Sequence, residues 1–185
     1  MRYLQWGLTH RDTARATPGF TLFTPLRNAT TYLVNMAGEI VHQWDLPAGP
    51  THYGYLLPNG NLLIALRSDD SPHEMARGGI MRELDWDGNI ISEYIDPYQH
   101  HDFRRCSNGN LMYLGWHLLP EEHAARVQGG MPGSEHEMGI WGDYIREVNP
   151  AGETVWRRSD RCGQAQHERR RGRPGCSRRG RRLVS

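Results

Sequence analysis

Two histidines, His52 and His101, occupy the same place in two copies of one repeated stretch. Each lies seven positions before an Asn-Gly pair, at Asn59-Gly60 and Asn108-Gly109 respectively. A neutral imidazole can act near pH 7 as a nucleophile or as a general acid and base. We therefore take His52 and His101 as the candidate catalytic residues. The competing interpretation for each is a hydrogen-bonded structural histidine at the start of a strand.

Arg67, His100 and Trp116 are the candidate substrate-binding residues. If each Asn-Gly pair is a two-residue hairpin loop, His52 lies opposite Arg67 and His101 lies opposite Trp116. An arginine beside histidines would suit an anionic, tetrahedral group. No metal or cofactor is expected, because adjacent residues of a strand, such as His100 and His101, point to opposite faces and cannot hold one ion together.

Turn chemistry predicts the strands that would carry these side chains. Asn-Gly and Asp-Gly pairs favour the positive φ angles of tight hairpin turns. A two-residue loop at 59–60 would place Leu57 opposite Leu62, Leu56 opposite Leu63 and Tyr55 opposite Ile64. Both faces of this hairpin would then be apolar. It must therefore be covered on both sides.

A second hairpin is repeated at residues 32–44, 82–94 and 146–156. The spacing of the two His-containing copies is 49 residues, and roughly 40 to 50 residues are usual for a propeller blade of four strands. We expect an all-β fold, a β-propeller of which this chain holds an incomplete set of two to three blades. Because propellers have about 4 to 8 blades, the open edges and faces would favour self-association.

Composition divides the chain of 185 residues into three parts: a polar segment 1–18, a partial propeller 19–157 and an Arg-rich tail 158–185. The basic residues are arginine throughout, and the tail lacks the apolar alternation of the preceding strands. We interpret the tail as disordered and as the product of a shifted reading frame. A natural basic arm that binds nucleic acid is the alternative, although the tail lacks tryptophan, tyrosine and phenylalanine for base stacking.

The remaining features of the sequence limit the cellular compartments in which we expect the chain. Its three cysteines, Cys106, Cys162 and Cys176, fit neither a disulfide framework nor a zinc ligand set. The first twenty residues carry charges throughout and hold no apolar run of signal-peptide length. No run approaches the roughly 18 apolar residues of a membrane span. These features predict a cytoplasmic chain without a membrane partner.

Several motifs together resemble the bacterial arylsulfotransferase family. They are residues 19–25 (Gly-Phe-Thr-Leu-Phe-Thr-Pro), 30–44 (which ends in Val-His-Gln-Trp), 56–63 (Leu-Leu-Pro-Asn-Gly-Asn-Leu-Leu), 83–89 (Glu-Leu-Asp-Trp-Asp-Gly-Asn) and 100–103 (His-His-Asp-Phe). The resemblance covers about residues 17–156. It implies a six-bladed propeller that transfers a sulfuryl group from a phenolic sulfate ester to a phenol through a sulfated histidine, without a nucleotide donor.

The resemblance also implies what the chain would lack. The sulfated histidine of the family is expected in later blades, so His52 and His101 carry over as channel histidines, His101 as part of the His-His-Asp-Phe motif. We therefore expect an arylsulfotransferase-like chain that is inactive alone. Members with this activity are often exported, whereas this chain shows no export signal. The alternative is a non-catalytic propeller fragment that binds a ligand or a protein.

Overall fold

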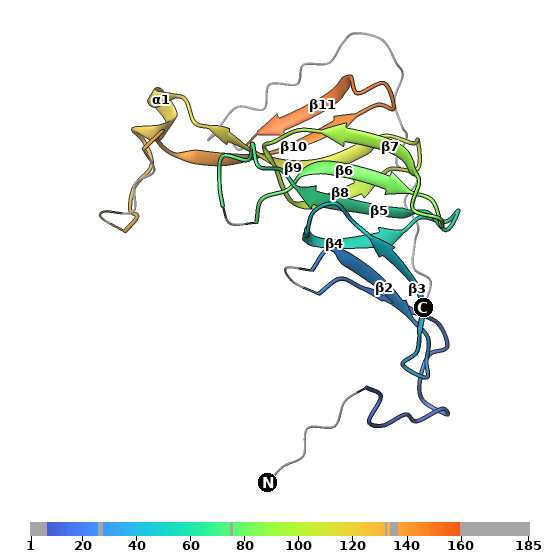
Figure 1. Cartoon of the computed structure of the whole chain (residues 1–185). Coiled ribbons are helices and arrows are strands. Elements are labelled where there is room, and N and C mark those ends of the chain that lie inside the picture. Colours follow the sequence, from blue (N-terminus) through green and yellow to red (C-terminus); the bar gives the residue numbers. More distant parts are fainter. Residues whose placement is uncertain (1–6, 26–27, 75, 132, 134–136, 160–185) are drawn as a thin grey trace, which may run out of the picture.

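The computed structural model describes residues 7–25, 28–74, 76–131, 133 and 137–159. It contains three antiparallel sheets that follow one another along the chain (Figure 1). The first has β1 (Thr21–Phe23), β2 (Thr30–Val34) and β3 (Ile40–Asp45). The second has β4 (Pro50–Leu56), β5 (Leu62–Arg67), β6 (Gly79–Leu84) and β7 (Ile90–Ile95). The third has β8 (Gln99–Arg105), β9 (Leu111–Leu118), β10 (Trp141–Val148) and β11 (Thr154–Ser159). The expected all-β class is confirmed.

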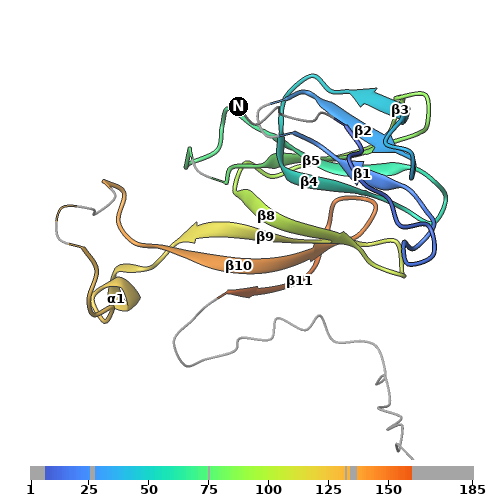
Figure 2. The same cartoon turned by 90° about the horizontal axis from the view of Figure 1, so that it is seen from below.

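Within each sheet the strands are hydrogen-bonded in sequence order. Short turns connect most of them, and the longest excursion described is the link between β9 and β10. That link contains the single-turn helix α1 (Glu121–Ala124), which lies beyond the ends of β9 and β10 in both views (Figures 1 and 2). The predicted tail falls almost entirely in residues 160–185, which lie outside the described residues, as do Cys162 and Cys176.

The predicted two-residue loop at Asn59-Gly60 is wrong by one residue. Leu56 pairs with Leu62 and Tyr55 pairs with Leu63, which leaves a loop of Pro58, Asn59 and Gly60. Gly60 alone of these three has a positive φ, 88°. Pro58 favours a type I turn, and a following left-handed glycine then closes a three-residue hairpin. The Asn59 side chain accepts a hydrogen bond from the Asn61 amide at 3.1 Å, which explains the asparagine without a positive φ.

The apolar residues of β5 form the centre of the packing. Leu62, Ile64 and Leu66 belong to a cluster shared with the first sheet, whereas Leu63 and Ala65 belong to a cluster shared with the third. All five are fully buried. The prediction that this hairpin has two apolar faces that are both covered is therefore confirmed for β5.

An aromatic residue in the outermost strand of each of the first two sheets contacts a turn of the following sheet. Trp44 of β3 donates a hydrogen bond from Nε1 to the carbonyl oxygen of Asp85, at 2.9 Å, in the turn between β6 and β7. Tyr94 of β7 lies with its ring 3.5 Å from the position that a Cβ atom would take at Gly152, in the turn between β10 and β11. An aromatic residue at the equivalent position of the outermost strand thus lies at a turn of the following sheet in both cases.

Candidate functional site

A bulge interrupts the first strand of the second sheet and the first strand of the third at the same place. In β8, His100 pairs with Leu114 and Phe103 pairs with Tyr113, so the step from 100 to 103 matches a single step in β9. In β4 the register shifts between Pro50 and Gly54. The bulge is therefore part of the repeat, and it contains both His52 and His101.

This bulge overturns the predicted opposition of His101 and Trp116. The Trp116 amide donates to the Tyr98 carbonyl instead, at 2.9 Å, and His100 stacks on the Trp116 ring. The predicted opposition of His52 and Arg67 is also wrong, because the Arg67 amide donates to the Gly49 carbonyl at 3.1 Å. Simple counting fails here because inserted residues change the register, and nothing in the residue types marks the insertion.

The bulge turns two adjacent histidines toward each other. His101 has a φ of 48°, in the left-handed region that residues with a side chain seldom occupy. The two rings lie edge to face, and their Nδ1 atoms are 2.8 Å apart. The expectation that His100 and His101 point to opposite faces is therefore wrong. Backbone strain of this kind is concentrated at functional sites, which makes the pair a candidate site.

His100 is the buried member of the pair, with 3% of its surface exposed. Its ring stacks on Trp116 at a centroid distance of 4.3 Å and an interplanar angle of 20°. Its Nε2 lies 3.3 Å from Oδ1 of Asp143 in β10. Burial lowers the pKa of His100, the Asp143 carboxylate opposes that shift, and His101 adds to it. The burial effect dominates, so His100 is neutral at pH 7.

The contact between the two Nδ1 atoms requires one ring to donate and the other to accept. In the tautomer that has the His100 proton on Nε2, facing the Asp143 carboxylate, Nδ1 of His100 accepts the hydrogen bond and Nδ1 of His101 donates it. In that tautomer the ring lone pair of His101 lies on Nε2.

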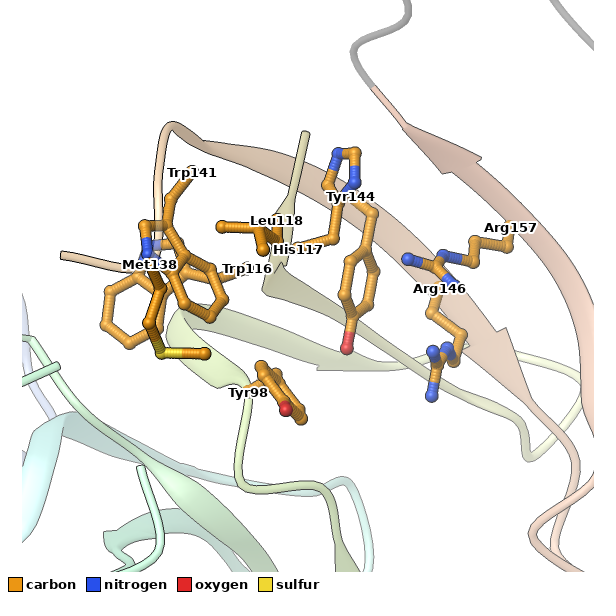
Figure 3. A pocket seen from close by; sticks show the side chains of 9 residues that line it. All are labelled: Tyr98, Trp116, His117, Leu118, Met138, Trp141, Tyr144, Arg146 and Arg157. Carbon is orange, nitrogen blue, oxygen red and sulfur yellow. The ribbon is translucent and has the colours of Figure 1, made fainter. Parts of the chain in front are cut away.

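Aromatic side chains extend the cluster into a groove of about 330 Å³. Figure 3 shows Trp116, Met138 and Trp141 together at one end, Tyr98 and Tyr144 between, and Arg146 and Arg157 at the other end. Trp116 joins the two features, because it stacks on His100 and also lines the groove, whereas the histidine that lines the groove is His117.

The buried carboxylate of Asp96 holds Tyr144, one of the residues that line this groove, in place. Oδ2 of Asp96 accepts hydrogen bonds from the hydroxyl groups of Tyr113 and Tyr144, each at 2.7 Å, and from Nη1 of Arg146 at 3.0 Å. Burial, followed by the bonds to Asp96, raises the pKa of Tyr144 far above its usual value. Both tyrosines therefore stay protonated and remain donors to Asp96.

Among the predicted site residues, the structure brings His100, His101 and Trp116 together. Arg67 ends β5, opposite Gly79 of β6. The backbone of His52 lies in β4, and its side chain lies outside what the structure describes. The site roles predicted for Arg67 and His52 remain predictions.

Sequence reasoning missed Asp143, His73 and Arg77. His73 meets the rings of Trp116 and Trp141 edge-on at centroid distances of 4.6 and 4.8 Å. Arg77 forms an isolated β-bridge with His100. None of these three lies in the repeated hairpins, so the repeat gave no signal for them. Only the folded chain brings His73, Arg77 and Asp143 to this cluster.

Two features are absent from the part of the chain that the structure describes. There, no group of three or more histidine, cysteine, aspartate or glutamate side chains is placed to hold a metal ion. Within the same residues, no helix is both long and apolar enough to cross a membrane.

Comparison with known proteins finds similarity among solved structures, of which six chains match. No protein-family model matches the chain, and no curated protein matches it. A solved structure of a protein of unknown function from Bacteroides caccae is similar over 77% of this chain, with 16% sequence identity and a TM-score of 0.47. The chain spans 46% of the length of that protein.

Proposed function

We propose that the three sheets are consecutive blades of a β-propeller, and that the chain forms part of an arylsulfotransferase-like site. In this proposal the whole propeller transfers a sulfuryl group from a phenolic sulfate ester to a phenol. The observation that carries the proposal is the repeated bulge, which pairs His100 with His101 beside Trp116. The sulfotransferase-like motifs of the sequence include both histidines.

The arrangement supplies two things that sulfuryl transfer between phenols needs. The first is a base, a role that we assign to Nε2 of His101 in the tautomer in which His100 carries its proton on Nε2. The second is a surface for an aromatic ring, which Trp116 and its neighbours in the groove provide.

The proposed role of His101 is to move one proton. As the acceptor phenol oxygen bonds to sulfur, the bond from sulfur to the sulfated histidine of a later blade breaks, and that histidine takes the bonding pair. The phenol proton passes to Nε2 of His101. General acid and base catalysis of this kind contributes roughly 100- to 10,000-fold to a rate.

The test is a transfer assay with para-nitrophenyl sulfate as donor and phenol as acceptor. It uses the protein whose reading frame is restored after codon 157, together with its His101→Ala and His10→Ala variants. We expect release of para-nitrophenol to depend on the acceptor and to fall at least tenfold in His101→Ala. His10 is exposed in the N-terminal segment, and its substitution should leave the rate unchanged. Release that is independent of phenol, or unchanged in His101→Ala, contradicts the proposal.

A second candidate function is binding of an aromatic ligand without chemistry. The aromatic groove favours it, because rings and apolar side chains line most of its surface. Tight binding of para-nitrophenyl sulfate without acceptor-dependent release would select this function over transfer.

A further inference from the structure

The second and third sheets differ in charge at one pair of equivalent positions. The turn between β6 and β7 and the turn between β10 and β11 are closed by the same two backbone hydrogen bonds. Aligning these turns makes Arg82 of β6 equivalent to Arg146 of β10. Arg82 lies directly opposite Glu93 of β7. Arg146 lies directly opposite Arg157 of β11, so the third sheet has an arginine where the second has a glutamate.

In the second sheet the two charges compensate each other. Nε of Arg82 donates a hydrogen bond to Oε2 of Glu93 at 2.7 Å. The third sheet has a second guanidinium in place of that carboxylate, and like charges directly opposite one another destabilise a sheet. The repeat therefore shows which compensated pair this position accepts, and the third sheet departs from it.

Asp96 compensates one of the two arginines of the third sheet. Its Oδ2 lies 3.0 Å from Nη1 of Arg146. Arg157 is exposed, and within the described part of the chain no carboxylate forms an ion pair with it. Two guanidinium groups beside one carboxylate leave an excess positive charge, which Arg157 carries.

This excess charge lies at one end of the aromatic groove. The guanidinium carbon of Arg157 is 4.1 Å from the centre of the Tyr144 ring, and that of Arg146 is 4.7 Å from it. Figure 3 shows both arginines beside Tyr144, at the end of the groove away from Met138 and Trp141. An arginine fork binds the oxygens of an anion, and aromatic side chains pack against a ring. The groove offers both surfaces together.

We propose that this groove binds an aromatic molecule that carries one anionic group, with the anion on Arg157 and the ring against the aromatic lining. The anionic group is an oxyanion, because two of its oxygens can accept hydrogen bonds from one guanidinium. The inference goes beyond the proposed function. The lining of the groove includes neither His100 nor His101, and binding here requires no transferred group.

The test is calorimetric titration of the chain of 185 residues with para-toluenesulfonate, with uncharged para-cresol and inorganic sulfate as comparisons. The sulfur of para-toluenesulfonate is bonded to carbon and cannot leave as a sulfuryl group, so the result is independent of the transfer assay. We expect the sulfonate to bind roughly tenfold more tightly than either comparison. Nuclear magnetic resonance should show that the ring signals of His117, which lines the groove, shift on binding.

Arg157→Glu gives the third sheet the pair of charges that the second sheet has. The variant should therefore be at least as stable as the unmodified protein in urea denaturation, yet bind para-toluenesulfonate roughly tenfold more weakly. Arg157→Gln removes the cation without adding an anion and should lose the same preference for the sulfonate. Arg158→Glu is the matched control, because it makes the same change of charge at the adjacent exposed residue, on the other face of β11.

Several results would overturn the inference. Equal binding of para-toluenesulfonate and para-cresol would show that no cation takes part, and equally tight binding of inorganic sulfate would show that no ring contact does. Undiminished sulfonate binding in both Arg157 variants, or an equal loss in Arg158→Glu, would place the anion elsewhere. Binding that leaves the His117 signals unchanged would exclude the groove.

Discussion

Because Gly115 of β9 has no side chain, the Tyr144 ring can occupy the space above it. A Cβ atom at Gly115 would lie 2.3 Å from Cζ and 2.4 Å from the hydroxyl oxygen of Tyr144, far inside contact distance. The Gly115→Ala variant must therefore displace the Tyr144 ring, which is 3% exposed and bonded to Asp96. The groove would lose part of its wall at the same time.

The magnitude follows from two losses. Overpacking of a closely packed site costs about 1 to 3 kcal/mol. A hydrogen bond to a charged group, here from Tyr144 to Asp96, contributes about 1.5 to 3 kcal/mol. Since a displaced ring could keep part of either contact, we expect the free energy of unfolding to fall by about 3 kcal/mol. Elsewhere in a strand, replacing glycine with alanine would stabilise by roughly 0.5 to 1 kcal/mol.

Urea denaturation followed by circular dichroism measures this change. Gly49→Ala is the control, because a Cβ atom there would meet its nearest neighbour, the Asn28 carbonyl oxygen, at an ordinary 3.6 Å. In the Tyr144→Leu background, Gly115→Ala should cost far less, since the clashing ring is gone. A loss below about 0.5 kcal/mol for Gly115→Ala alone, or an equal loss in both backgrounds, would refute the packing described for Tyr144.

Three further changes test the fold and the cluster. Asp96→Asn should lower the free energy of unfolding by about 3 kcal/mol, because it leaves the partly buried Arg146 without its carboxylate; calorimetry that shows no loss would contradict this. Trp44→Phe should cost about 1 kcal/mol through the lost bond to Asp85, measured by urea denaturation. Burial lowers the pKa of His100 in the folded state below the 6.5 of the unfolded chain. The contribution of neutral His100 to the free energy of unfolding should therefore be complete above pH 6.5 and be lost as the pH falls through the folded-state pKa. Between pH 8 and pH 5 the urea midpoint of unfolding should fall less in His100→Gln than in the unmodified protein. An equal fall in both proteins would contradict the burial of a neutral His100.

The sequence predicted the strands well because the turns and the apolar periodicity are local signals. An Asn-Gly pair between two apolar runs, such as Asn108-Gly109, indicates a hairpin. The three copies of the second hairpin supported the same prediction. The positions of the loops were less predictable. The two-residue prediction failed at both Asn-Gly pairs, because Ser107, Asn108 and Gly109 form the same three-residue loop as Pro58, Asn59 and Gly60 without a proline.

The site was predicted only in part. His100, His101 and Trp116 were found because they belong to repeated motifs, but their mutual geometry depends on a bulge that no residue type marks. Asp143 was missed for a different reason. It meets His100 only through the pairing of β9 with β10, across a connection that contains α1 and shows no repeat.

Binding of an aryl sulfate to the 185-residue chain tests the proposed site most directly. Nuclear magnetic resonance of the histidine ring protons would follow titration with para-nitrophenyl sulfate, with para-nitrophenol as the uncharged comparison. We predict that the sulfate ester shifts the His100 and His101 signals at lower concentration than the phenol does, and that His101→Ala weakens binding at least fivefold while His10→Ala does not. Equal binding of ester and phenol, or shifts confined to other histidines, would contradict the assignment of this cluster as a sulfuryl-transfer site.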